Sequence, residues 1–268
     1  LEYIGDRAFA HNPTVKQITI PENVKEMGTY VFRYAPLEQV EFLAPLTEIP
    51  YGTFYLTDLK SVILPDTLKE IGEYAFGGCN GLEEIVIPDS VETIGKRAFR
   101  NCSSLTSIHL PEALTYVGES AFELCELITE LVIPPNLAEI GICAFAGLGV
   151  DSIHIPSSVK KIGMMAFSTC ENVTEITIEN GVETIGTRAF EWNKATEIAI
   201  PESVRELGTE IISETLIETV YYNAIELDKN LGRAPTSKCP IFSSNAIAFS
   251  SAISLGTFLL IKKSFNFL

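Results

Sequence analysis

Basic residues are scarce in this sequence. Its 19 Lys and Arg stand against 35 Asp and Glu, which gives a formal net charge of −16 at pH 7. Because proteins bind nucleic acid largely through cationic side chains on the phosphates, this balance excludes nucleic acid as an expected partner. Anionic membrane surfaces are disfavoured for the same reason. A basic protein, a cation or a neutral glycan is easier to accommodate.

Long apolar runs are also missing. The stretch that comes nearest to a membrane segment, 246–261, has 16 residues and contains three serines and a glycine. A membrane-spanning helix needs about 20 mostly apolar residues, so no membrane anchor is predicted. No leader peptide is recognisable at the start. Because Leu1 already lies inside a repeat, we expect the chain to be trimmed, so that an original signal could have been removed.

What the sequence does contain is one recurring pattern, L-x-x-I-x-I-P-x-x-V-x-x-I-G-x-x-A-F-x-x-C. Residues 59–79, 82–102 and 105–125 show it most clearly. The phenylalanines keep its register in steps of 22 or 23 residues, and Ile212 takes the tenth position. They are Phe9, Phe32, Phe54, Phe76, Phe99, Phe122, Phe145, Phe167 and Phe190. A fixed period of this length with strand-like aliphatic spacing is typical of leucine-rich repeats.

Each position of the pattern has a physical reason. The I-x-I segment alternates, so two aliphatic side chains point inward and the residue between them points out. The proline then ends the strand because it has no N–H to donate. The V-x-x-I-G segment predicts a second strand, whose glycine serves either a positive-φ turn or a close backbone approach. We therefore predict a β-rich leucine-rich-repeat solenoid, a right-handed coil of stacked parallel strands with about ten repeats of 22–23 residues.

Four cysteines occupy one position of the repeat, three residues after the phenylalanine. They are Cys79, Cys102, Cys125 and Cys170, and Asn12, Thr57 and Asn193 take the same position in other repeats. A disulfide framework or a metal site is the alternative interpretation, but a spacing of 23 matches no zinc motif. We expect a buried row of free thiols whose small polar groups hydrogen-bond to the turning backbone.

The I-P…V-x-x-I-G-x-x-A-F-x-x-C pattern resembles the BspA-like class of leucine-rich repeats. Ile87-Pro88, Ile94-Gly95, Ala98-Phe99 and Cys102 carry the resemblance most clearly. It covers residues 1 to about 222, which we assign to the solenoid, and we expect 223–268 to form an expanded and degenerate C-terminal repeat or cap. The resemblance implies a surface-exposed or secreted protein that adheres to host proteins or other cells.

Little in the sequence suggests catalysis or a cofactor. His109 and His154 lie in the outward position of their strands, two rungs apart, and so about 10 Å from each other. One zinc ion cannot bridge that gap with bonds of about 2.0–2.1 Å. Ser107 and His109 stand two residues apart on a strand, about 6.6 Å, which is too far for a nucleophile and its base. No phosphate loop or cofactor motif is present, so we expect no catalytic residue, metal or cofactor.

The outward positions of the L-x-x-I-x-I strands define a candidate binding surface, the outer sheet face. Its three columns hold nine acidic residues and two lysines. The residues that we select as the candidate partner-binding set are Glu41, Ile63, Glu84, Val86, His109, Glu130, Val132, His154, Glu175 and Glu197. Acids on an exposed sheet also keep a protein soluble, which is the simpler interpretation. The exposed Ile63, Val86 and Val132 favour a contact site instead.

These observations favour a non-enzymatic protein-interaction module at the cell surface or in the extracellular space. A basic or extracellular-matrix protein is the partner that the acidic face fits. The alternative is a structural spacer within a larger surface protein. The sequence does not indicate an oligomeric state.

Overall fold

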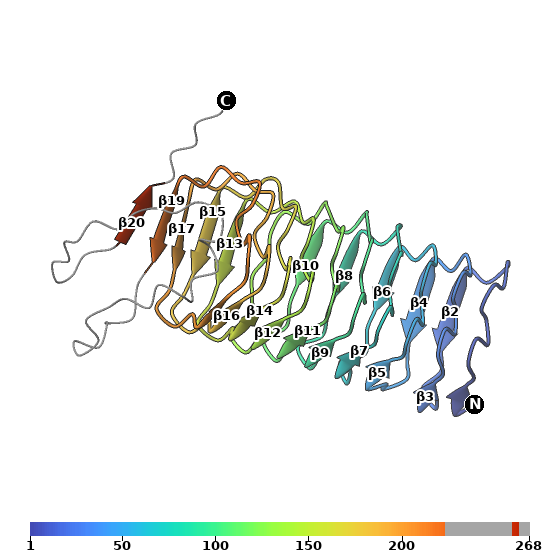
Figure 1. Ribbon diagram of the computed structural model, residues 1–268. Coiled ribbons are helices and arrows are strands. Elements are labelled where there is room, and N and C mark those ends of the chain that lie inside the picture. Colours follow the sequence, from blue (N-terminus) through green and yellow to red (C-terminus); the bar gives the residue numbers. More distant parts are fainter. Residues whose placement is uncertain (223–258, 263–268) are drawn as a thin grey trace.

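The computed structural model describes residues 1–222 and the backbone of the strand Leu259–Lys262. The described chain forms an elongated coil of about ten turns, as the repeat predicts, and no helix occurs between residues 1 and 222 (Figure 1). The predicted cap, 223–268, lies outside the described residues apart from this one strand. So do Cys239 and most of the apolar stretch 246–261.

The first row of strands comes from the L-x-x-I-x-I segments and forms the outer sheet face. It consists of β2 (Gln17–Ile20), β4 (Gln39–Phe42), β6 (Ser61–Ile63), β8 (Glu84–Val86), β10 (Ser107–His109), β13 (Ser152–Ile155), β15 (Glu175–Ile178), β17 (Glu197–Ile200) and β19 (Thr219–Tyr222). Parallel pairing joins β2 through β10, then β13 with β15, then β17 with β19. The last strand, β20 (Leu259–Lys262), pairs antiparallel to β19, opposite to the direction of a further coil.

The second row comes from the V-x-x-I-G segments. It consists of β1 (Tyr3–Ile4), β3 (Glu26–Met27), β5 (Glu48–Ile49), β7 (Glu70–Ile71), β9 (Thr93–Ile94), β11 (Tyr116–Val117), β12 (Glu139–Ile140), β14 (Lys161–Ile162), β16 (Thr184–Ile185) and β18 (Glu206–Leu207). Strands β5 to β18 form one continuous eight-stranded parallel sheet. Glycine follows all of these strands except β5, which Pro50 follows, and in most repeats it allows close approach rather than a positive φ: a Cβ on Gly95 would lie 2.7 Å from the backbone nitrogen of Glu73.

The third segment of every repeat contains two residues in the left-handed conformation. They stand two positions before and two after the repeat phenylalanine, as Arg97 and Asn101 do around Phe99 (φ 55° and 60°). A left-handed residue other than glycine costs about 1–2 kcal/mol. Interrepeat hydrogen bonds hold it: the amides of Arg97, Phe99 and Asn101 each donate to a carbonyl of the next repeat at 2.8 Å.

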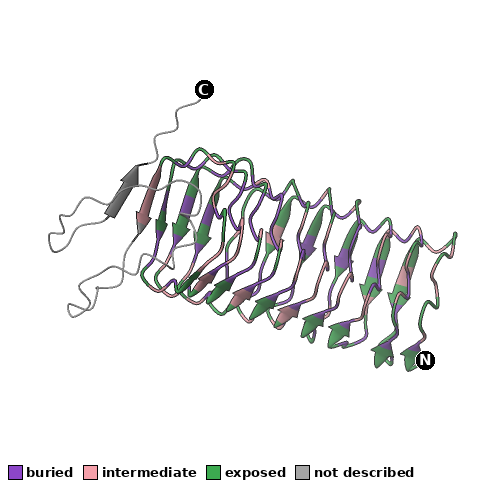
Figure 2. Cartoon of the chain, viewed as in Figure 1, coloured by how far each residue is buried: buried purple, intermediate pink, exposed green. Residues whose placement is uncertain are grey.

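The phenylalanines form the core, as predicted. From Phe32 to Phe190 they are fully buried, and each stacks on the next with ring centroids 5.1–5.7 Å apart. Phe9 stacks on Phe32 at 5.4 Å but is only partly buried, because no ring covers its other side in the described chain. The interior is therefore one column of rings lined by the inward aliphatic side chains of both strand rows (Figure 2).

The cysteine row is also as predicted. Cys79, Cys102, Cys125 and Cys170 are buried free thiols. Each donates to the carbonyl oxygen of a phenylalanine in an earlier repeat, at 3.1–3.3 Å. Thr57 and Asn193 hydrogen-bond in the same place to Phe54 and Phe190 of their own repeats. The position requires a small donor, which sulfur, hydroxyl and amide groups all supply.

Where the structure departs from a uniform ladder, it does so on the outer sheet face. Residues 128–133 keep the alternating exposure of a strand but carry no strand pairing, and β15 does not pair with β17. The connection before β13 is one residue shorter than the one before Leu131, since Ile153 follows Phe145 by eight residues and Leu131 follows Phe122 by nine, but the connections before β10 and Leu131 are equal. Connection length alone does not account for the breaks, because β2 and β4 differ by the same one residue and still pair over four residues.

Removing one phenylalanine ring from the middle of the column should destabilise the protein more than removing the ring at its N-terminal end. We expect Phe99→Ala to lower the free energy of unfolding by about 3–5 kcal/mol, since the ring is fully buried and leaves a cavity. Phe9→Ala is the matched control and should cost clearly less. Urea denaturation followed by circular dichroism measures both values. Equal losses would contradict a shared interior stack.

Burial should also protect the thiols. It raises the pKa of Cys79 and Cys170 to about 12, whereas Cys143 is only half-buried. We expect iodoacetamide to modify Cys143 before the four buried cysteines, as peptide mass spectrometry would show. Because the folded pKa of the buried thiols is raised, their contribution to stability should hold below the ordinary thiol pKa and decline as the pH rises towards 12. Labelling of Cys102 as early as that of Cys143 would contradict the buried row of thiols.

Candidate functional site

The outer sheet face has the register that the repeat predicts. Its third column places Ile63 beside Val86 and Val86 beside His109. The second column places Ser107 beside Glu84 and Ser152 beside Glu175. Along each strand these positions are exposed and their neighbours are mostly buried, which Figure 2 shows as alternating colours. Glu130 and Val132 point outward too, but from the unpaired segment 128–133.

Three apolar side chains stand exposed in the third column. Ile63 is 81% exposed, Val86 74% and Val132 78%. Ile63 and Val86 lie on adjacent strands and His109 continues the column towards Val132. These side chains bury nothing within the chain, so folding alone does not account for them.

The acidic residues of the face are mostly without cationic partners. Lys16 and Lys60, the two lysines of the columns, both pair with Glu38, at 3.1 and 2.5 Å. The hydrogen bond from Lys60 is the largest cause that lowers the pKa of Glu38 below its ordinary value, and the hydrogen bond from Lys16 is the second. The other eight acids of the nine form no ion pair in the described chain. These are Glu41, Glu83, Glu84, Glu130, Asp151, Glu175, Glu197 and Glu218. The negative charge is therefore concentrated beyond β6.

One contact on the face was not expected from the repeat. The Nε2 atom of His154 lies 3.1 Å from the Oε1 atom of Glu179 in the next repeat. Glu179 occupies the place of the repeat proline, and its other carboxylate oxygen accepts a hydrogen bond from the amide of Ser157 at 2.9 Å. That backbone hydrogen bond is the main reason why the pKa of Glu179 lies below its ordinary value. The missing proline was the sequence signal for this pair.

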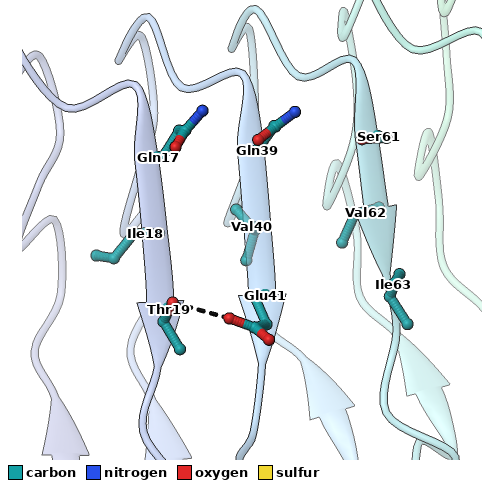
Figure 3. A pocket seen from close by; sticks show the side chains of 9 residues that line it. All are labelled: Gln17, Ile18, Thr19, Gln39, Val40, Glu41, Ser61, Val62 and Ile63. Atoms are coloured by element: carbon teal, nitrogen blue, oxygen red, sulfur yellow. Dashed lines mark hydrogen bonds between the residues drawn. The ribbon is translucent and has the colours of Figure 1, made fainter.

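A shallow open depression lies over β2, β4 and β6 (Figure 3). Gln17 and Gln39 flank one end, while Glu41 and Ile63 lie towards the other. Glu41 is held by the hydroxyl of Thr19, which donates to its Oε2 atom at 3.0 Å. The depression has no converging pair of carboxylates and suits a surface contact better than an enclosed small molecule.

Within the described residues, no group of three or more His, Cys, Asp and Glu side chains is arranged to hold a metal ion. The same residues contain no helix long and apolar enough to cross a membrane.

A family comparison accounts for the repeat. The model of the BspA type leucine-rich repeat region matches in overlapping segments, 1–104, 47–171 and 120–231. The chain belongs to this family. BspA-type repeats therefore explain most of its length, and such proteins generally serve as protein-interaction or surface proteins rather than enzymes.

Solved leucine-rich repeat structures resemble this BspA-type chain. A protein from Bacteroides ovatus is 25% identical, with a TM-score of 0.50, and the match covers 80% of each chain. A protein from Eubacterium ventriosum is 25% identical, with a TM-score of 0.51, over 83% of this chain and 57% of the other. The pneumococcal vaccine antigen PcpA shares the fold at 20% identity and a TM-score of 0.52, over 83% and 67% of the two chains. No curated protein matches the chain.

If the outward apolar residues are free of a structural role, replacing one should leave stability almost unchanged. We expect Val86→Thr to change the free energy of unfolding by less than about 1 kcal/mol. Ile85→Thr, on the same strand but 4% exposed, should cost about 1–3 kcal/mol because it buries a hydroxyl. Urea denaturation compares the two. If Val86→Thr greatly lowered the free energy of unfolding, the Val86 side chain would have a structural role.

Proposed function

We propose that the protein is a non-enzymatic interaction module outside the cell and that its outer sheet face binds a basic protein. The observation that carries this proposal is the combination of eight unpaired acids with three exposed apolar side chains on one surface. Apolar side chains supply contact area at the centre of an interface, and charges around them select the partner and speed association.

The spacing of the acids supports an electrostatic role. Glu84, Glu130 and Glu175 recur on alternate rungs, about 10 Å apart at two strand spacings. That is close to the Debye length at 0.1 M salt, so each carboxylate is only weakly repelled by the next. A partner with a row of basic side chains would meet one carboxylate after another. The row thus suits a basic surface longer than a single side chain.

A secreted or cell-surface location is part of the proposal. BspA-type proteins are generally interaction or surface proteins, and the exposed acidic and apolar columns give this chain a surface for such contacts. An adhesive role towards matrix proteins is the specific form that we favour.

A structural spacer is the second candidate. It is favoured by the elongated array and by the alternation of acids with serines, which also discourages sheet-to-sheet association. A spacer would need no partner on the outer face.

Charge reversal on the face separates these candidates. We expect the triple variant Glu84→Lys, Glu130→Lys and Glu175→Lys to weaken binding to immobilised basic extracellular-matrix proteins by on the order of tenfold or more. The matched control reverses Glu26, Glu70 and Glu206, which are exposed on the second strand row. Surface plasmon resonance measures both variants at low and physiological salt. Equal weakening by both triples, or no binding by the unaltered protein, would contradict the proposed face.

A further inference from the structure

A second surface, away from the outer sheet face, gathers tyrosines. Five of the nine tyrosines in the chain lie in the third segments of repeats two to four, where Tyr30, Tyr51 and Tyr74 closely follow β3, β5 and β7 (Figure 1). Tyr30 contacts Tyr51 with centroids 4.9 Å apart, and Tyr51 contacts Tyr74 at 5.9 Å. Tyr55 joins the group at 5.3 Å from Tyr74 and 6.3 Å from Tyr34. We call this group, with Arg7 and Arg33, the tyrosine ledge.

Arg33 lies among these rings. Its guanidinium carbon is 4.9 Å from the centroid of Tyr30, 4.8 Å from Tyr34 and 5.7 Å from Tyr55. It forms no ion pair and no side-chain hydrogen bond with the described residues, and its Nε atom is buried without a partner. The aromatic faces thus hold the guanidinium in place, and its two terminal nitrogens, unlike the buried Nε, remain free for a ligand.

Arg7 and His11 extend the ledge into the first repeat. The guanidinium carbon of Arg7 lies 5.7 Å from the ring centroid of Tyr30, and the ring centroids of His11 and Tyr34 are 4.9 Å apart. Arg7 also forms no ion pair within the described chain. Most other cations there do pair with acids, among them Lys16, Lys25, Lys60, Lys69, Lys96, Arg97, Arg100, Lys161 and Arg188.

The acids nearest to the ledge leave these arginines unpaired. The Oδ1 atom of Asp6 accepts hydrogen bonds from the amide and the hydroxyl of Thr29, which are the main causes that lower its pKa; the charge of Arg7 lowers it further, although the two side chains form no ion pair. Glu73 lies near Tyr51 but pairs with neither arginine. The side-chain hydrogen bond with Tyr30, more than any other cause, raises the pKa of Tyr51 to about 12, so that ring stays neutral. The charge of the ledge is carried by its arginines.

Two unpaired guanidinium groups among aromatic rings suit one kind of ligand. A guanidinium fork matches the geometry of a carboxylate or sulfate and binds it through paired hydrogen bonds. The negative face of a tyrosine ring attracts the weakly positive C–H groups of a sugar ring. We propose that the tyrosine ledge binds an anionic glycan, with Arg33 and Arg7 on its carboxylate or sulfate groups and Tyr34 against a sugar face. This site is independent of the outer sheet face.

The acidity of the chain limits what the ledge can bind. At −16 the protein repels long polyanions, but repulsion from charges beyond about 8–10 Å is largely screened at physiological salt. A short anionic oligosaccharide can therefore occupy the ledge without meeting the acids of the outer face.

Calorimetric titration with three oligosaccharides of equal length tests the proposal: an oligogalacturonate, a sulfated dextran fragment and a neutral dextran fragment. We expect at least one anionic probe to bind and the neutral one to bind at least tenfold more weakly. The two anionic probes distinguish carboxylate from sulfate. Arg33→Gln and Tyr34→Ala should each weaken the binding of the preferred probe by on the order of tenfold.

Two matched variants serve as controls. Arg205→Gln removes an exposed arginine that also lacks an ion pair but has no tyrosine around it, and Trp192→Ala removes an aromatic ring from the same left-handed column as Tyr34, with 48% exposure against 44%. Both should bind like the unaltered protein.

Equal weakening by the controls would overturn the proposal, as would binding of oligoglutamate as tight as that of the preferred probe. So would the absence of binding by both anionic probes. If Arg33→Gln fails to fold, the NMR signals of Tyr30 and Tyr34 in the unaltered protein decide: they must shift with the preferred probe and not with oligoglutamate.

Discussion

The structure depends on stacking of the repeat phenylalanines, and hence on keeping each ring in register with the next. A ring fits only if its repeat carries the same number of residues between ring and strand as its neighbour, or nearly so. The amides around Phe99 reinforce the requirement, because they donate to the following repeat and hold two residues in the left-handed conformation. Where the outer ladder opens, at residues 128–133 and between β15 and β17, the rings remain stacked.

The requirement for stacked rings restricts the residues of the interior but not those of the surface. The interior positions accept few residue types: phenylalanine in the column with Ile212 as the exception, a small donor such as Cys102 at the turn, and glycine at most places where backbones nearly touch. Outward positions are under no such restriction, so lysine, glutamate, valine and histidine all occur in them. The functional differences among proteins with this scaffold must therefore lie in the outward columns and in the third segments, including the tyrosine ledge.

The sequence was sufficient for the fold and for the strand register because both follow from a repeated spacing. It predicted the buried phenylalanines, the free thiols and the outward columns that include Glu84 and Val86. It did not predict the open ladder at 128–133, because this segment has the same alternation of aliphatic residues as the strands that do pair. Nor did it predict the pair of His154 with Glu179, although the replaced proline marked the place. The tyrosines were visible at fixed offsets from the phenylalanines, but their contact with Arg33 depends on side-chain conformations that spacing alone does not define.

The backbone hydrogen bonds that join one third segment to another all point the same way, from the amides of one repeat to the carbonyls of the next. The second strand row donates in the reverse direction, as the amide of Gly95 does to the carbonyl of Ile71, and most junctions between repeats share this arrangement. Gene segments encoding whole repeats could thus be duplicated or lost without creating a new kind of junction. A lineage could lengthen or shorten this protein and thereby change which outward residues stand side by side, while the junctions themselves stayed chemically the same.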